Sequence, residues 1–189
     1  MTAEPARAGA GLPVWARVAL FFVVIVTLVW FTNIEPGRRC VAEPVTRISV
    51  LAARFVINAF GGEARADGTF LSGPTAMLDI KDGCNGVIAM ILYVAAVLAH
   101  AAAPAAKLSG LAIGIPAIWA INLLRIVTLY AVAVVAPGRL EFFHIYFWQT
   151  LIIIFVAILW YLWADRSLRR ESRDAARGFG RPEGGGGAS

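Results

Sequence analysis

One cysteine, one arginine and one histidine belong to three different apolar segments of this chain: Cys84 and His144 stand just before two of them, and Arg125 lies within a third. A thiol becomes a strong nucleophile as the thiolate. An imidazole titrates near neutrality, so it can take the thiol proton and return it to a leaving amine. A guanidinium stays charged and offers a planar fork of donors to a developing oxyanion. These groups match the nucleophile, the base and the stabiliser of acyl transfer.

Three neighbouring residues could support this set. Asn122 precedes Arg125 by one helical turn, so the two side chains share one helix face. The pair either lines a polar cavity or serves interhelical hydrogen bonding. Asn85 and Gly86 follow Cys84 directly, and small residues at such a place let a substrate backbone approach. The sequence contains no metal-ligand cluster, phosphate-cradling loop or nucleotide motif, so we expect neither a metal nor a cofactor.

Cys84 has a second interpretation. Cys40 is the only other cysteine, and the topology argued below places it on the same side of the membrane. An oxidising compartment would allow a structural disulfide between the two. The chain would then be a non-enzymatic membrane scaffold, or a small transporter that uses Asn122 and Arg125 as an anion site. The cationic neighbourhood of Cys84 instead favours a free thiol, more acidic than an ordinary cysteine, with Cys40 dispensable.

The composition is that of a membrane protein. Of the 189 residues, 59% are hydrophobic and 15% are charged, against about 45–50% and about 25% in soluble domains. A chain of this length has room for about four spanning helices of roughly 20 residues. The formal net charge of +5 does not indicate nucleic-acid binding, because a basic cluster after the last apolar run fixes orientation in the membrane. That cluster consists of Arg166, Arg169, Arg170 and Arg173.

Four apolar runs predict membrane spans at residues 18–31, 86–103, 108–136 and 145–163. The third run is too long for one upright helix. Gly114 and Pro116 within it predict a tilt, a kink or a partly re-entrant start.

Basic residues before the first run and after the last predict that both termini are cytoplasmic. Cys84 then opens the second span at the outer face, and His144 opens the fourth span there. Arg125 lies about 27 Å along the third span from Lys107, and therefore at the same outer depth. His100, at the inner end of the second span, is expected to be a bystander.

Residues 35–83 form the main extramembrane segment. Within it, residues 44–60 are predicted to form an amphipathic helix that Pro44 starts and Gly61-Gly62 stops. Its apolar face is expected to lie along the membrane surface. That face consists of Val41, Val45, Ile48, Leu51, Phe55 and Ile57 or Ala59. Turn residues at Asp67-Gly68 and Ser72-Gly73-Pro74 then predict a small β-hairpin.

The predicted fold class is therefore an all-α integral membrane protein, with about four transmembrane helices, an extracytoplasmic amphipathic helix and a small hairpin. Residues 1–165 form a single membrane-embedded domain. Residues 166–189 form a cytoplasmic, basic and glycine-rich tail whose composition predicts disorder.

Three motifs in this order resemble the exosortase/archaeosortase family: Gly83-Cys84-Asn85-Gly86 at a helix start, Asn122-Leu123-Leu124-Arg125-Ile126 in the next span, and His144 opening the last. The resemblance covers about residues 75–165. Members of this family are membrane cysteine enzymes that process proteins with a C-terminal sorting signal, made of a short motif, a transmembrane helix and a basic tail. The short chain and the Cys-Asn-Gly sequence resemble a compact branch, exosortase H. Asn85 departs from the common family form, which has Ser or Thr there.

The resemblance implies that Cys84 is a nucleophile that forms a thioester acyl-enzyme, that Arg125 is the essential arginine and that His144 is the general acid/base. The chain would be a cysteine protease/transpeptidase of the inner membrane, with its active site on the extracytoplasmic side. Its partners would be exported proteins that carry the sorting signal, and the lipid bilayer. The sorting motif, the oligomeric state and the acyl acceptor (water, or a lipid or glycan amine) stay open.

Overall fold

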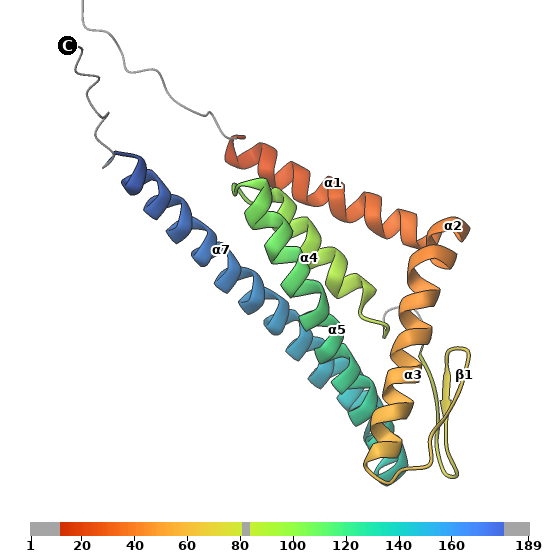
Figure 1. Ribbon diagram of the computed structural model, residues 1–189. Helices are drawn as coiled ribbons and strands as arrows, with labels where there is room; N and C mark the ends of the chain where they lie inside the picture. The colour runs from red at the N-terminus through yellow and green to blue at the C-terminus, as the bar shows by residue number, and fades with distance from the viewer. Residues whose placement is uncertain (1–11, 81–83, 180–189) are drawn as a thin grey trace, which may run out of the picture.

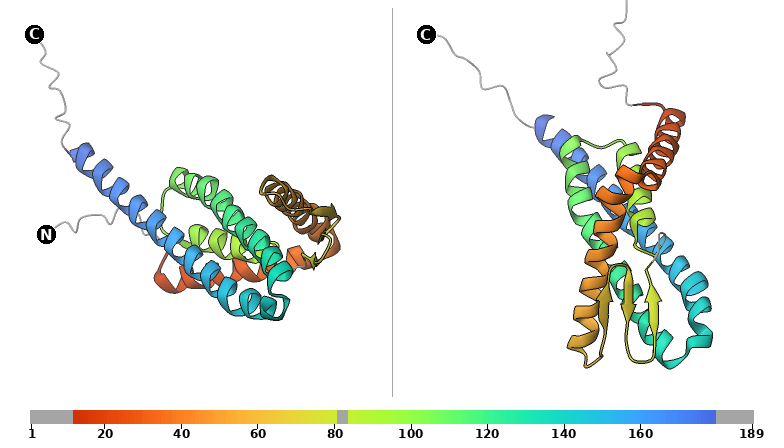
Figure 2. Two further views of the ribbon diagram at one scale, coloured as in Figure 1. Left: turned by 90° about the horizontal axis from the view of Figure 1, so that it is seen from below. Right: turned by 90° about the vertical axis from the view of Figure 1, so that its right-hand side faces the viewer.

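The computed structural model describes residues 12–80 and 84–179, and its main body is a bundle of helices. Four of them lie side by side over much of their length (Figures 1 and 2). They are α1 (Val14–Asn33), α4 (Val87–Ala99), α5 (Pro104–Val135) and α7 (Gln149–Phe179). α4 contacts each of the other three helices and so forms the centre of the bundle. The all-α fold class that the sequence predicted is confirmed.

A second layer covers one end of the bundle. α1 leads through α2 (Glu35–Gly37) and the π-helical turn η1 (Arg38–Ala42) into α3 (Glu43–Ala59). α3 turns steeply away from the direction of α1 and packs along α5 (Figure 1). After α5 the chain reverses through η2 (Pro137–Arg139), α6 (Leu140–Phe142) and the π-helical turn η3 (Phe143–Trp148) into α7.

Three helices of the described residues are long and apolar enough to cross a membrane: α1, α5 and the helical stretch Pro137–Arg170. The second predicted span is shorter than expected. α4 has 13 residues, or about 20 Å of helix, against a hydrocarbon core of about 30 Å. The helix ends early because His100 adopts an extended conformation, with φ −69° and ψ 142°.

α5 is one continuous helix of 32 residues that contains Pro116, so the third span has no re-entrant start. Gly114 does not break the helix; it allows α5 to pack closely against α4. A Cβ atom at Gly114 would overlap the ring of Tyr93 on α4, so the glycine lets the two helices approach closely. The Tyr93 hydroxyl donates a hydrogen bond to the Gly110 carbonyl at 3.1 Å, which ties α4 to the first part of α5.

α3 has nearly the predicted bounds, and the face opposite most of the predicted apolar stripe packs against the protein. Ile48 and Leu51 are each 56% exposed and Phe55 is 76% exposed. The buried side consists of Thr46, Ser49, Val50, Ala53 and Ile57. Small side chains allow α3 to pack closely on α5, and the Ser49 hydroxyl is satisfied because it donates to Val45 and accepts from Trp119 Nε1 of α5. The predicted apolar stripe thus lies on the outside of the protein, on the side that a membrane surface would contact.

A three-stranded antiparallel sheet occupies the place of the predicted hairpin. β1 (Arg65–Asp67), β2 (Phe70–Ser72) and β3 (Met77–Asp79) pair in sequence order, with Leu71 opposite both Ala66 and Leu78. Leu71 is fully buried in a cluster that joins the sheet to α3 and α5. The cluster consists of Val50, Ala53, Ile57, Ala64, Leu71, Ile80, Ile126 and Tyr130. This core fixes the sheet beside the turn that carries Cys84, which also packs against the cluster.

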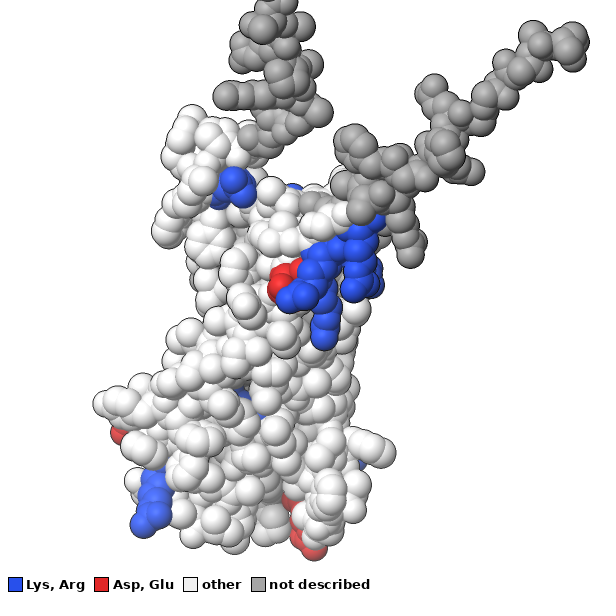
Figure 3. Space-filling view, turned by 90° about the vertical axis from the view of Figure 1, so that its left-hand side faces the viewer, with Lys and Arg blue, Asp and Glu red and all other residues white. Residues whose placement is uncertain are grey.

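Charged residues gather at the two ends of the bundle. Figure 3 shows a broad surface with few charges between a cluster of basic residues near one end and scattered charges at the other. α7 continues to Phe179, so the first part of the predicted disordered tail is helical. Arg169 Nε lies 2.8 Å from Asp165 Oδ2, a spacing of four residues that supports an exposed helix. Residues 180–189 of the predicted tail lie outside the described residues.

Candidate active site

Cys84, Arg125 and His144 come from three separate parts of the chain, and the structure brings their side chains together. The Cys84 Sγ lies 2.6 Å from His144 Nε2. Arg125 Nη2 lies 3.9 Å from the same sulfur. Arg125 as a whole is 3% exposed. Gly83, the first residue of the motif around Cys84, lies outside the described residues. The spacing that the sequence analysis used thus identifies a real cluster of nucleophilic, cationic and basic groups.

A π-helical turn carries His144. It comprises residues Phe143–Trp148 and joins α6 to α7. A π-helical turn holds one more residue than the α-helical turn it replaces, so it rotates the side chains that precede it, and such turns recur at functional sites. Trp148, at the end of the turn, is 4% exposed and belongs to the core between α4, α5 and α7. The buried tryptophan anchors the turn, and the turn directs His144 toward Cys84.

The main chain at Cys84 is held by α5. Asn122 Nδ2 donates a hydrogen bond to the Cys84 carbonyl at 3.1 Å. Gly86 makes this approach possible, since it has φ +79°, a conformation that other residues rarely adopt. A Cβ atom at Gly86 would also lie 2.9 Å from Cγ of Asn122. The hydrogen bond from Asn122 therefore depends on the absence of a side chain at Gly86.

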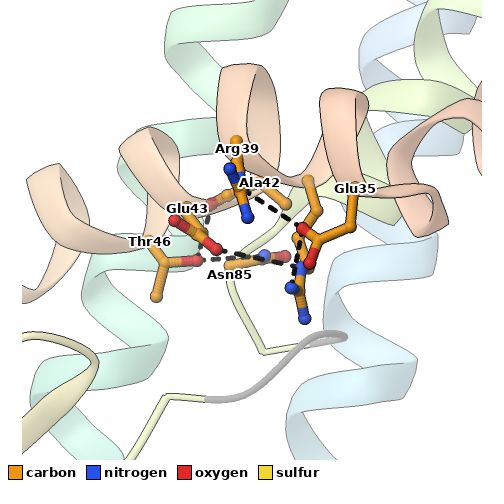
Figure 4. Close-up of polar contacts among 7 residues, drawn as sticks. Glu35, Arg39, Ala42, Glu43, Thr46 and Asn85 are labelled. Carbon is orange, nitrogen blue, oxygen red and sulfur yellow. Dashed lines mark hydrogen bonds and ion pairs between the residues drawn. The ribbon is translucent and has the colours of Figure 1, made fainter.

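Asn85 links the same turn to α3. Its side chain is 1% exposed; Oδ1 accepts from the Val87 N–H at 3.1 Å and Nδ2 donates to Thr46 Oγ1 at 3.1 Å. Thr46 Oγ1 in turn donates to the Ala42 carbonyl at 2.8 Å. Figure 4 shows Asn85 pointing from the turn toward Thr46 on α3. The sequence analysis missed Thr46, although a hydroxyl beside the apolar positions of α3 was the signal that could have identified it.

The electrostatic surroundings of Cys84 contradict the predicted acidic thiol. Burial raises the pKa of Cys84 above its ordinary value. The Arg125 guanidinium lowers the pKa and the Asp79 carboxylate raises it, but both effects are smaller than that of burial. The thiol is therefore protonated at neutral pH, and its activation requires a base.

The two cysteines do not form the disulfide of the alternative interpretation. Cys40 is exposed on η1 and Cys84 is half-buried in the turn before α4, and both are free. The described residues contain no group of three or more histidine, cysteine, aspartate or glutamate side chains that could hold a metal ion.

Two cavities border the cluster, each lined by different members of it. The outer one has a volume of about 520 Å³, and both Cys84 and His144 line it. The second, of about 230 Å³, lies between α1, α4 and α7 and is lined in part by Gly86, Arg125 and Gln149. Within the described part of the chain, Arg125 Nε and Asn122 Oδ1 are buried without a hydrogen-bond partner. Gln149, a polar side chain in an apolar stretch, lines the same cavity as Arg125, and the sequence analysis did not identify it.

Comparison with known protein families identifies a match. A family model described as transmembrane exosortase matches residues 8–161, which include every residue of the cluster and of its supporting turn. The match covers most of the chain, including α1 and the apolar part of α7. No curated protein and no solved structure matches the chain.

Proposed function

The chain belongs to the transmembrane exosortase family, and from this premise we propose that it cleaves the C-terminal sorting signals of exported proteins through a Cys84 acyl-enzyme. The observation that carries the proposal is the 2.6 Å contact between Cys84 Sγ and His144 Nε2, with Arg125 Nη2 3.9 Å from the sulfur. The substrate is a protein with a short motif, a transmembrane helix and a basic tail, and the reaction takes place at the outer face of the cytoplasmic membrane.

Acylation begins with a neutral thiol. As Cys84 Sγ attacks the carbonyl carbon of the scissile peptide bond, Nε2 of His144 takes the thiol proton. A C–S bond forms and the carbonyl π electrons move onto the oxygen. Arg125 stabilises this oxyanion in a site that excludes most water, where a charge-assisted hydrogen bond is strong. The raised pKa of Cys84 supports a general-base role for His144, because it disfavours a preformed thiolate.

Collapse of the tetrahedral intermediate breaks the C–N bond. The His144 imidazolium gives its proton to the leaving amine, which departs with the transmembrane helix of the signal. The exported protein is then bound to Cys84 as a thioester. An acceptor, either water or an amine, loses a proton to His144 as it attacks the thioester carbonyl, and Cys84 leaves as the thiol. The Asn122 and Asn85 contacts hold the Cys84 main chain in place through both steps.

The non-enzymatic alternatives gain no support from the same geometry. A scaffold with a Cys40–Cys84 bridge requires a disulfide, and both cysteines are free. An anion-transporting site requires free Asn122 and Arg125 side chains. Instead, Asn122 donates to the Cys84 carbonyl and Arg125 contacts the Cys84 sulfur.

The test is in-cell processing of an exported reporter fused to a C-terminal signal of this kind from the same genome. Cys84→Ala should abolish processing, whereas Cys40→Ala, the matched loss of the other thiol, should retain it. His144→Ala should leave at most a trace, since proton transfer contributes typically about 10²–10⁴-fold. Membrane levels of each variant are checked by immunoblot. Normal processing by a well-expressed Cys84→Ala variant would contradict the proposal.

A further inference from the structure

The outer cavity, which Cys84 and His144 line, is bounded by β3, by α5 and by the chain reversal after α5. One wall is β3 and the residue after it, represented by Leu78, Asp79 and Ile80. Ile126 and Leu129 of α5 form an apolar floor. The opposite wall is the chain reversal after α5, from Pro137 through Leu140 and Glu141 to His144 and Ile145. The cavity thus extends from the Cys84 thiol toward the end of α5, away from the interior of the bundle.

β3 presents a sheet edge to this cavity. The described sheet has the order β1-β2-β3, so β3 is an edge strand. The Ala76 carbonyl accepts from Gly73 N at 2.8 Å and Ile80 N donates to the Thr69 carbonyl at 3.0 Å, which shows that these two residues direct backbone groups toward β2. Backbone groups alternate along a strand, so those of Met77 and Asp79 point to the opposite edge. That edge lies on the side of α6 and η3 (Figure 2, right).

We propose that the substrate segment on the acyl side of the scissile bond binds in this cavity as an extended strand added to the outer edge of β3. The inference rests on the proposed peptidase function of Cys84. The assignment to the acyl side follows from direction: the leaving side continues into the bilayer as a helix, whereas the cavity extends toward Pro137 and Leu140 beyond α5. Backbone hydrogen bonds to an edge strand supply affinity, and alternate side chains supply specificity.

The cavity lining indicates which side chains the strand carries. Alternate residues of an added strand face the floor formed by Ile126 and Leu129, which favours apolar side chains at every second position. Among the described lining residues the charged ones are Asp79 and Glu141, and both are acidic. Like charges brought together across an interface disfavour binding. The peptide is therefore alternately apolar, and acidic residues in it bind poorly.

A peptide that alkylates Cys84 tests the binding mode directly. The probe is a six-residue peptide of alternating alanine and valine that ends in a chloromethyl ketone. Extended, it spans about 20 Å, enough to lie beside β3 while its ketone methylene reaches the thiol. A C–S bond forms and chloride leaves. The rate is measured by intact-protein mass spectrometry on the full chain in detergent micelles with Cys40→Ala, and is divided by the rate with iodoacetamide.

N-methylation of one peptide bond at a time gives the decisive readout. A bound strand turns every second N–H toward β3, so methylation should slow Cys84 alkylation about three- to tenfold at alternate positions, the effect of one lost hydrogen bond. Replacing two alanines of the probe by glutamates should slow the reaction, and Glu141→Gln should restore part of the loss. Met77→Pro should react more slowly than Met77→Ala by a similar factor, because both remove an exposed side chain and only proline removes the N–H.

Two kinds of failure are distinguishable. If iodoacetamide does not alkylate Cys84 in the folded protein, the nucleophile assignment and the proposed function fail. If iodoacetamide reacts but the N-methyl scan lacks a period of two, or Met77→Pro equals Met77→Ala, strand addition at β3 is overturned while the peptidase function stands.

Discussion

The reactivity of Cys84 depends on two opposing influences of its surroundings. Burial raises its pKa, and the Arg125 guanidinium acts against this without cancelling it. Asp79 adds to the increase. A protonated thiol next to an imidazole reacts fastest when the base removes its proton in the attack itself, and the raised pKa slows, without preventing, unspecific oxidation or alkylation between substrates.

The alkylation of Cys84 should therefore rise with pH and reach its midpoint above that of N-acetylcysteine. Asp79→Asn should shift the midpoint down because it removes a negative charge. Arg125→Gln should shift it up because it removes the positive charge that favours the thiolate. Iodoacetamide kinetics followed by mass spectrometry in the Cys40→Ala background give these profiles. A midpoint below that of N-acetylcysteine would instead support the acidic thiol that the sequence suggested.

The shape of the Arg125 side chain should matter as much as its charge. Arg125→Lys keeps the cation but cannot offer two parallel donors to an oxyanion. Processing of the reporter should fall by about 10²–10³, the usual effect of losing one oxyanion donor. His100→Ala is the control, because His100 packs against Trp160 and Trp163 at the far end of α4. Wild-type processing by a well-expressed Arg125→Ala variant would favour a structural arginine.

At the level of elements, the turn from Cys84 to α4 depends on Gly86. Gly86→Ala combines a left-handed backbone, which costs roughly 1–2 kcal/mol outside glycine, with a Cβ atom 2.9 Å from Asn122 Cγ. Processing should fall at least tenfold and the melting temperature in micelles should drop. Gly138→Ala, which has no atom within 4 Å of its Cβ, should keep both values. Equal processing and equal melting temperatures of the two variants would show that the site does not require a glycine at position 86.

The hydrogen bond between Asn85 and Thr46 connects this turn to α3, and a double-mutant cycle isolates it. Asn85→Ala and Thr46→Val each break the 3.1 Å contact, and each also loses another bond. The coupling free energy should be about 0.5–1.5 kcal/mol, that of one net hydrogen bond. Thermal unfolding of the four proteins in one detergent measures it. Strictly additive effects would mean that α3 does not hold the turn.

These elements also show what the sequence could and could not predict. The apolar runs predicted α1, α5 and α7, and the turn residues at Asp67-Gly68 and Ser72-Gly73-Pro74 predicted part of the sheet, because both signals are local in the sequence. The sequence predicted an apolar stripe on α3, most of which is exposed, but it did not predict the face that packs against α5. In a membrane protein an apolar face can meet lipid while small and hydroxyl-bearing residues such as Thr46 and Ser49 meet a neighbouring helix.

The candidate site, too, was predicted from the sequence only in part. Residue type and depth brought Cys84, Arg125 and His144 together, since each follows from a helix end or from a position along a helix. The π-helical turn at His144, the buried Asn85–Thr46 contact and the cavity position of Gln149 depend on side chains far apart in sequence. The raised pKa of Cys84 has the same origin, because burial is a tertiary property.

At the scale of the whole molecule, the direction of the bundle decides which side of the membrane the site faces. Lys107 lies at the start of α5, and its Nζ donates to the Leu98 carbonyl near the end of α4 at 2.7 Å. His144 follows the opposite end of α5. α4 therefore returns from the Cys84 turn to the Lys107 end, even though its 13 residues are shorter than a full span.

Substituted-cysteine labelling should place the Lys107 end in the cytoplasm and the Cys84 end outside. Arg17, Lys107 and the arginines of α7 would then be inside, as the positive-inside rule requires. In a Cys40→Ala, Cys84→Ala background, a membrane-impermeant maleimide on intact spheroplasts should label Met77→Cys, whose native side chain is 65% exposed. Lys107→Cys and Arg170→Cys should be labelled only after permeabilisation. The reverse pattern would put the thiol in the cytoplasm, where an exported protein does not meet it, and would refute both the topology and the proposed reaction.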